Sequence, residues 1–175
     1  MAALKIPVGK QDHIQGNAKA GCTLVEYGDF ECPHCRAACD LVEELQQHFG
    51  KRLRFVFRNF PLTNIHANAQ AAAEVAEYAD SQGKFWKMHD LLYENQPRLG
   101  DELYGELAAQ LKLDADALRE ALVSKTFADR VRADFLGGVR SGVNGTPTFY
   151  INDERYDDSM DFASMVAAIE KASGS

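Results

Sequence analysis

The chain has 175 residues, a formal net charge of −7 and four cysteines. Its length suits one domain, or one domain with a large insertion, and its near-average composition argues against a disordered or coiled-coil protein. The acidic charge argues against nucleic-acid binding, which needs a basic face to meet phosphates. Four cysteines in a chain of this length are too few for a fold built on disulfides.

The N-terminal region bears on location. The first sixteen residues contain no apolar run of signal-peptide length, and no later segment is long enough to span a membrane. We therefore expect no stable membrane insertion and a cytoplasmic location for the chain as written. A periplasmic or extracytoplasmic location is the alternative, if a leader has been removed.

The first third of the chain has the pattern of a β–α–β unit. Residues 22–29 and 53–57 are short apolar segments with β-branched and aromatic residues, which predicts two buried strands. Between them, apolar residues recur at helical spacing from Pro33 to Phe49. A helix between two strands favours a parallel strand pair.

Residues 64–141 show only helical periodicity, with Asp101 and Asp114 as candidate N-caps. Strand signals return at Thr148–Ile151 and at residues 155–156, and an amphipathic helix is expected over residues 160–172. The sequence therefore predicts an α/β core formed by residues 1–63 and 142–175. An all-helical insertion over residues 64–141 interrupts this core.

Cys32-Pro33-His34-Cys35 stands where the first predicted strand passes into the helix. Pro33 suits the first helical position, where its missing N–H costs nothing, so Cys32 becomes the N-cap. The unpaired N–H groups and the helix dipole stabilise a thiolate there, and His34 adds to this if it is protonated or donates a hydrogen bond. A stabilised thiolate is reactive toward disulfides, and Cys35, one turn later, can close or resolve the bond.

Other uses of these cysteines are possible. Cys39 extends the motif to three cysteines, but a structural zinc site takes ligands from separate loops, whereas Cys35 and Cys39 fall on one helix. Two inert core thiols are a second alternative. We expect an N-cap cysteine at a strand end to be exposed, and this argues against that alternative. A CxxC motif beside a βαβ pattern is typical of a redox pair.

A second motif, Gly145-Thr146-Pro147, leads directly into the predicted strand at Thr148. A proline at the start of a strand, after a glycine, is typical of a cis X–Pro bond. A cis bond would turn the Thr146 backbone toward the cysteines, where it can pair with an extended substrate segment. The alternative is a trans proline at a strand edge.

Several further residues are interpreted as structural. Cys22 and Cys39 are expected to be free thiols, since a disulfide needs Cα atoms within ~7 Å and suitably aimed Cβ vectors. His66 and His89 are expected to be packed or capping residues, and Trp86 to belong to the core. The acidic residues between positions 153 and 161 are expected to form a solvated turn and helix start.

These motifs resemble the DsbA-like branch of the thioredoxin superfamily. Glu26–Cys35 (EYGDFECPHC) and residues 145–149 (GTPTF) occur in the order of that branch, and residues 57–62, 65–66 and 83–89 are also similar to it. The resemblance implies a thioredoxin fold with an inserted all-helical subdomain, and thiol–disulfide exchange without a metal or organic cofactor. It implies protein or peptide thiols and disulfides as substrates, and an unidentified redox partner that recycles the cysteines.

The resemblance also implies roles for site residues. Cys32 is the attacking cysteine, Cys35 is the buried one, and Pro147 is the cis-proline that lines the substrate groove. Glu26 matches a buried acid that relays protons to the inner cysteine, and a carboxyl inside the strand layer should have a raised pKa. The alternative for Glu26 is an ordinary surface position on its strand.

The direction of exchange stays open in the sequence. The Pro33-His34 pair matches strongly oxidising members of the branch, whereas Thr146 before the proline matches several isomerase-type members. Three functions therefore remain: an oxidising thiol–disulfide oxidoreductase, a cytoplasmic disulfide reductase or isomerase, and a non-catalytic thioredoxin-fold binding module.

Overall fold

The computed structural model describes residues 3–174. Its centre is a five-stranded sheet in the order β1-β3-β2-β4-β5. The strands are β1 (His13–Gly16), β2 (Cys22–Gly28), β3 (Leu53–Asn59), β4 (Thr148–Ile151) and β5 (Glu154–Tyr156). β2 and β3 are parallel and joined through α1 (Pro33–Phe49), which confirms the predicted βαβ unit, while the other neighbouring pairs are antiparallel.

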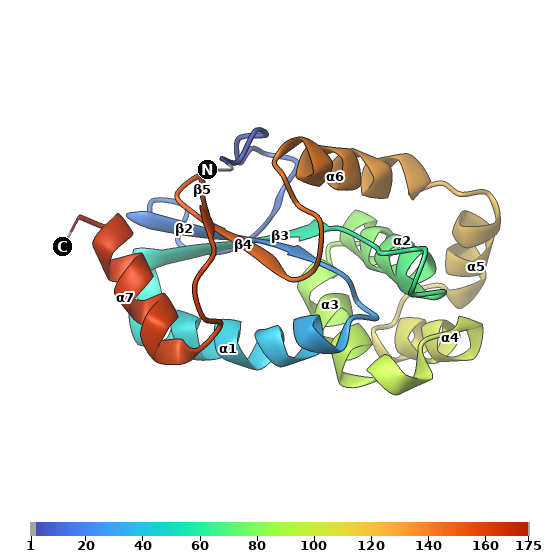
Figure 1. The fold of residues 1–175 in the computed structure, drawn as a ribbon. Helices are drawn as coiled ribbons and strands as arrows, with labels where there is room; N and C mark the ends of the chain where they lie inside the picture. Colours follow the sequence, from blue (N-terminus) through green and yellow to red (C-terminus); the bar gives the residue numbers. More distant parts are fainter. Residues whose placement is uncertain (1–2, 175) are drawn as a thin grey trace.

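Helices cover both faces of the sheet. Figure 1 shows α1 and α7 (Phe162–Ala172) on one face and α6 (Ala128–Arg140) on the other. Between β3 and α6 the chain forms α2 (Ala69–Ser81), α3 (Phe85–Glu94), α4 (Asp101–Gln110) and α5 (Ala115–Val123). Figure 1 shows α4 and α5 beyond the end of the sheet at which β3 finishes, whereas aromatic side chains of α3 pack against Phe55 and Phe57 of β3. The division into a core and an insertion at residues 64 and 141 stays a prediction.

The element ends differ from the sequence pattern at several points. Asp114 caps α5 as expected, because its side chain accepts hydrogen bonds from two backbone N–H groups of the first turn. The expected Asp101 cap is wrong: Gly100 is the N-cap of α4, and Asp101 is the first residue inside the helix. α2 begins at Ala69, and α7 begins after Asp161, whose carboxylate accepts from the Ser164 N–H.

Alternate residues of the central strands enter two separate cores. Leu24 and Phe57 belong to the larger core beside α1, whereas Val25, Tyr27 and Val56 belong to the smaller one on the opposite face. Because both faces are covered, hydrophobic alternation in the sequence could not show which face a given residue meets. Within residues 3–174, no helix combines the length and the apolar character needed to cross a bilayer.

Candidate active site

The nucleophile position is built by α1 and the loop before β4. Cys32 is the N-cap of α1 and Pro33 its first residue, as predicted. The Thr146–Pro147 bond is cis, also as predicted, and the Cys32 thiol lies 3.5 Å from the Thr146 carbonyl oxygen, to which it can donate a hydrogen bond. Cys32 is only 4% exposed, so the expectation of an exposed N-cap cysteine is wrong: the cis-proline loop approaches its sulfur.

The surroundings of Cys32 favour its thiolate. A hydrogen bond from the Cys35 thiol lowers the pKa of Cys32 to about 5 and outweighs burial, which raises it. The backbone N–H groups of Cys35 and His34 lower it further. Cys32 is therefore ionised at neutral pH. His34 contributes here through its backbone; the role of its exposed imidazole stays a prediction.

Cys35 has the opposite character. Its side chain is fully buried, and the Asp29 N–H lies 3.5 Å from its sulfur. Burial raises the pKa of Cys35 far above its usual range, and the Cys32 hydrogen bond and the Glu26 charge add to this. All four cysteines are free thiols, with Cys22 buried and Cys39 half-buried. The CxxC motif thus contains one thiolate, at Cys32, and one protonated thiol, at Cys35.

Glu26 is buried in the sheet, which excludes the surface alternative. It is 2% exposed, and in the strand register it faces Phe57 of β3 and Phe149 of β4. Burial raises the pKa of Glu26 to about 8, and the negative charge of Cys32 adds to this. At neutral pH the folded protein therefore holds Glu26 mostly as the neutral acid.

Asp29, whose role no motif in the sequence marks, anchors the loop before the cysteines. One carboxylate oxygen accepts from the Glu31 N–H at 2.8 Å. The other accepts from the Leu62 N–H at 2.9 Å and lies 2.7 Å from His66 Nδ1. The loop that follows β3 is thereby fixed to the active-site loop. His66 is held at this junction, ahead of α2, rather than within a helix.

Two further side chains hold this loop. Gln96 lies in a short 3-10 helix (Gln96–Arg98), and its Nε2 donates to the carbonyl oxygens of Phe30 at 2.8 Å and Cys32 at 2.9 Å. Glu31 accepts from the backbone and side-chain amides of Asn68. No local sequence signal marks these partners, because their roles depend on contacts between segments far apart in the chain.

The structure gives the zinc alternative no support. Among residues 3–174, the side chains placed to share a metal ion are His13, Glu77 and Asp80, whose ligand atoms lie within 4.8 Å of one another. The cysteines form no such group in this part of the chain. His13 is already bonded at 2.7 Å to Glu77 and lies 3.3 Å from Asp80.

The chain is similar to known proteins over most of its length. A family model described as "Thioredoxin" matches residues 9–171. Among solved structures, BdbD from Bacillus subtilis has a TM-score of 0.89 and 28% identity, with 99% of each chain covered. A thioredoxin-like oxidoreductase from Silicibacter pomeroyi has a TM-score of 0.83 and 23% identity, with 95% of each chain covered, and shares the fold. Alpha-DsbA1 of Wolbachia pipientis has a TM-score of 0.81 and 20% identity, with 98% and 94% covered, and also shares the fold.

Curated relatives are longer proteins. A protein named Na(+)/H(+) antiporter NhaA 1, from Salinispora arenicola, is 44% identical over 170 residues, which is 97% of this chain and 26% of that protein. A protein named Na(+)/H(+) antiporter NhaA, from Herminiimonas arsenicoxydans, is 38% identical over 168 residues, or 95% of this chain and 27% of that protein. The chain thus spans about a quarter of the length of these relatives, and the antiport in their names belongs to the longer proteins.

Proposed function

Because the chain belongs to the thioredoxin family and has the fold of its DsbA-like members, we propose that it exchanges disulfides with protein or peptide thiols through Cys32 and Cys35. The observation that carries this proposal is the contrast between the two thiols. Cys32 is ionised at neutral pH and stands beside the cis-proline loop, while Cys35 is buried behind it with a raised pKa. A nucleophile and a resolving thiol are the two parts that exchange requires.

In the oxidising direction, a substrate thiolate attacks the Cys32 sulfur of a Cys32–Cys35 disulfide. The bond between the cysteines breaks, Cys35 leaves and takes a proton, and a mixed disulfide joins Cys32 to the substrate. A second substrate thiolate then forms the substrate disulfide and releases Cys32, which leaves readily because its pKa is low. Two electrons pass from the substrate to the cysteine pair, so sulfur chemistry suffices without a metal or organic cofactor. The reducing direction reverses these steps.

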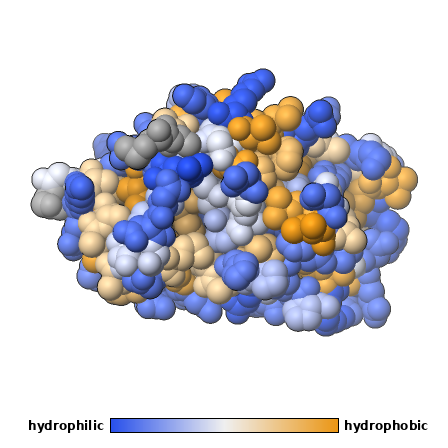
Figure 2. Space-filling view, in the orientation of Figure 1, coloured by the Kyte–Doolittle hydropathy of each residue, from blue (hydrophilic) through white to orange (hydrophobic). Residues whose placement is uncertain are grey.

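The Thr146–Pro147 segment is the proposed substrate-binding edge. The Thr146 backbone stands next to the Cys32 sulfur, where an extended peptide can add main-chain hydrogen bonds. Figure 2 shows hydrophobic side chains on this face, over α6 and near the end of β3. Ile65, Leu136 and Val139 are exposed in these segments, at 67%, 39% and 50%. They favour unfolded or extended polypeptide substrates over small polar thiols.

An insulin-reduction assay tests the proposal with matched cysteine variants. Cys32→Ser should abolish turnover, because no thiolate remains at the head of α1. Cys39→Ser is the control and should keep the wild-type rate, since that thiol is away from the exchange chemistry. Equal rates for wild type and Cys32→Ser would refute the enzyme and favour a non-catalytic binding module.

The direction of electron flow separates an oxidase from a disulfide reductase or isomerase. The low pKa of Cys32 favours an oxidant, because a stabilised thiolate stabilises the reduced form. Thr146 before the proline favours the reductase or isomerase. The equilibrium of the Cys32–Cys35 pair with glutathione measures the reduction potential and decides between them. The cytoplasmic location and the partner that recycles the cysteines stay predictions.

A further inference from the structure

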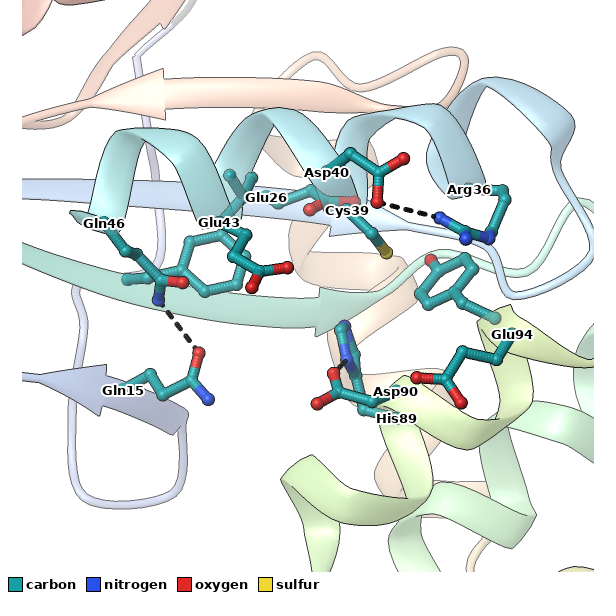
Figure 3. Close-up of a pocket in the computed structure, with 13 residues that line it drawn as sticks. Gln15, Glu26, Arg36, Cys39, Asp40, Glu43, Gln46, His89, Asp90 and Glu94 are labelled. Atoms are coloured by element: carbon teal, nitrogen blue, oxygen red, sulfur yellow. Dashed lines mark hydrogen bonds and ion pairs between the residues drawn. The ribbon is translucent and has the colours of Figure 1, made fainter. Parts of the chain in front are cut away.

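A pocket of about 390 Å³ opens between α1 and α3 and reaches Glu26 (Figure 3). Three polar atoms of its lining residues have no hydrogen-bond partner among residues 3–174: Glu26 Oε2, His89 Nε2 and the Tyr93 hydroxyl. All three side chains are more than nine-tenths buried. Buried polar atoms in folded proteins are satisfied by protein or by ordered water. A polar pocket of this size admits several water molecules, which can join these three atoms.

The protonation states give these atoms complementary roles. His89 Nδ1 lies 2.9 Å from Asp90 Oδ1, and a carboxylate only accepts, so Nδ1 carries the hydrogen. Burial lowers the pKa of His89, so the ring is neutral and Nε2 offers a lone pair. Glu26, with its pKa raised to about 8, carries a proton at neutral pH. A proton donor thus stands at the floor of the pocket and an acceptor at its wall.

The surroundings of His89 allow it to hold a proton only briefly. Aromatic rings of α3, of β3 and of the loop before α1 pack against the imidazole, and burial among them disfavours its charged form at rest; they belong to Phe30, Phe57, Phe85, Trp86 and Tyr93. The charged and titratable groups around the ring and the pocket are mostly acidic, and they are Glu26, Arg36, Cys39, Asp40, Glu43, Asp90, Tyr93, Glu94 and, on β1, His13. The Arg36 cation is bonded to Asp40. The Asp90 carboxylate, bonded to Nδ1, lowers the cost of a transient imidazolium.

Resting on the proposed function, we propose that the Asp90–His89 pair is the outlet through which the proton of Cys35 passes from Glu26 to solvent. Figure 3 shows His89 and Asp90 of α3 on the side of the pocket opposite Cys39 of α1, with their hydrogen bond drawn. The Asp90 side chain is 61% exposed, so the pair joins the buried floor of the pocket to water. His89 and Asp90 are positioning residues for the proton and do not touch the substrate.

The step balances in the reducing direction. In the mixed disulfide Cys32 has no charge, so its contribution to the raised pKa of Glu26 is absent and more of the Glu26 carboxyl is ionised. The Cys35 thiol gives its proton to that carboxylate, and its sulfur attacks Cys32. The Cys32–Cys35 bond forms, the bond from Cys32 to the substrate breaks, and the substrate leaves as a thiolate. Glu26 then passes the proton through pocket water to His89 Nε2, while Nδ1–H releases its own proton past Asp90. The departing thiolate takes a proton from solvent.

A stopped-flow reaction of the reduced protein with an aromatic disulfide (Ellman's reagent) separates the two thiols. The first release of thionitrobenzoate reports attack by Cys32, and the second reports attack by Cys35. We expect Asp90→Asn to slow the second phase about threefold and leave the first unchanged, because its amide stabilises the imidazolium less. Glu94→Gln is the matched control: it removes another exposed carboxylate of the pocket rim and should change neither phase.

A second variant tests the imidazole itself. His89→Gln should slow the second phase about tenfold. This effect is smaller than is usual for a general acid–base group, because water can still carry part of the proton transfer. Added imidazole, which can enter the open pocket, should restore the rate, whereas the much weaker base pyrazole, of similar size, should not. A merely structural His89 would give no such difference between the two additives.

The outcomes distinguish this proposal from the proposed function. Two phases in the wild type, with a second phase that is unchanged in Asp90→Asn, would overturn the outlet and leave the exchange function intact. If Cys32→Ser loses both phases while Asp90→Asn and His89→Gln keep the wild-type rates, the exchange function is supported and the outlet is refuted. A wild type without a fast first phase would refute the exchange function itself. If His89→Gln does not fold, Asp90→Asn decides, because its side chain lies at the surface.

Discussion

Glu26→Gln should make the folded protein more stable at alkaline pH. The unfolded chain loses the Glu26 proton near its ordinary pKa of 4.5, whereas the folded protein keeps it until about 8. Below pH 4.5 both states are protonated and the carboxyl has no effect. As the pH rises from 4.5 to about 8, only the unfolded state gains the solvated charge, so the free energy of unfolding falls. At about 1.4 kcal/mol for each pH unit, the loss reaches about 5 kcal/mol.

Glutamine cannot ionise, so the variant lacks this loss. We expect wild type and Glu26→Gln to have similar stability near pH 4.5, and the variant to gain steadily up to about pH 8. The full 5 kcal/mol is an upper limit for the oxidised protein, because the Cys32 charge contributes to the shift only when the thiols are reduced. Urea unfolding across this pH range measures the effect, provided the m-value stays constant.

Glu43→Gln is the control for this experiment, since Glu43 is an exposed carboxyl on α1 near the same pocket. It should keep the pH slope of the wild type. Parallel curves for wild type and Glu26→Gln across the whole range would refute the reasoning, because they would mean that Glu26 ionises alike in the folded and unfolded states.

Three other predictions follow from the geometry. The ultraviolet absorbance of the reduced protein should show a thiolate titrating near pH 5, and Cys32→Ser should remove it. Gly138→Ala should destabilise the protein by about 1–3 kcal/mol in thermal or urea unfolding, because its Cβ would lie within 3.0 Å of two aromatic rings below α6. Gly105→Ala, in the open on α4, should instead add about 0.5–1 kcal/mol through helix propensity. Gln96→Ala should lower the free energy of unfolding by about 1–3 kcal/mol and raise the pKa of Cys32, because the carbonyl groups of Phe30 and Cys32 lose their hydrogen bonds. Gln82→Ala, at an exposed position, should change neither quantity.

Much of the fold was predictable because its signals are local. The helix from Pro33 to Phe49, its cysteine N-cap and the run of helices before Gly142 follow from spacing and capping chemistry within a few residues. No sequence pattern predicted β1, because its four residues form a strand only through pairing with β3. The start of α2 was missed for a related reason: the loop before it is held by contacts with Asp29 and Glu31.

The sequence by itself determined which atoms could react: two thiols at a helix start, a proline ahead of a strand, and an acid six residues before the first cysteine. Only the tertiary structure decided how they differ. The Cys32 sulfur lies next to the carbonyl oxygen of Thr146, which is 114 residues away in the chain. Glu26 is paired in the sheet with Phe57 and Phe149, and Glu26 and His89 line one pocket. A pKa depends on burial and on neighbours in space, and the order of residues along the chain specifies neither directly.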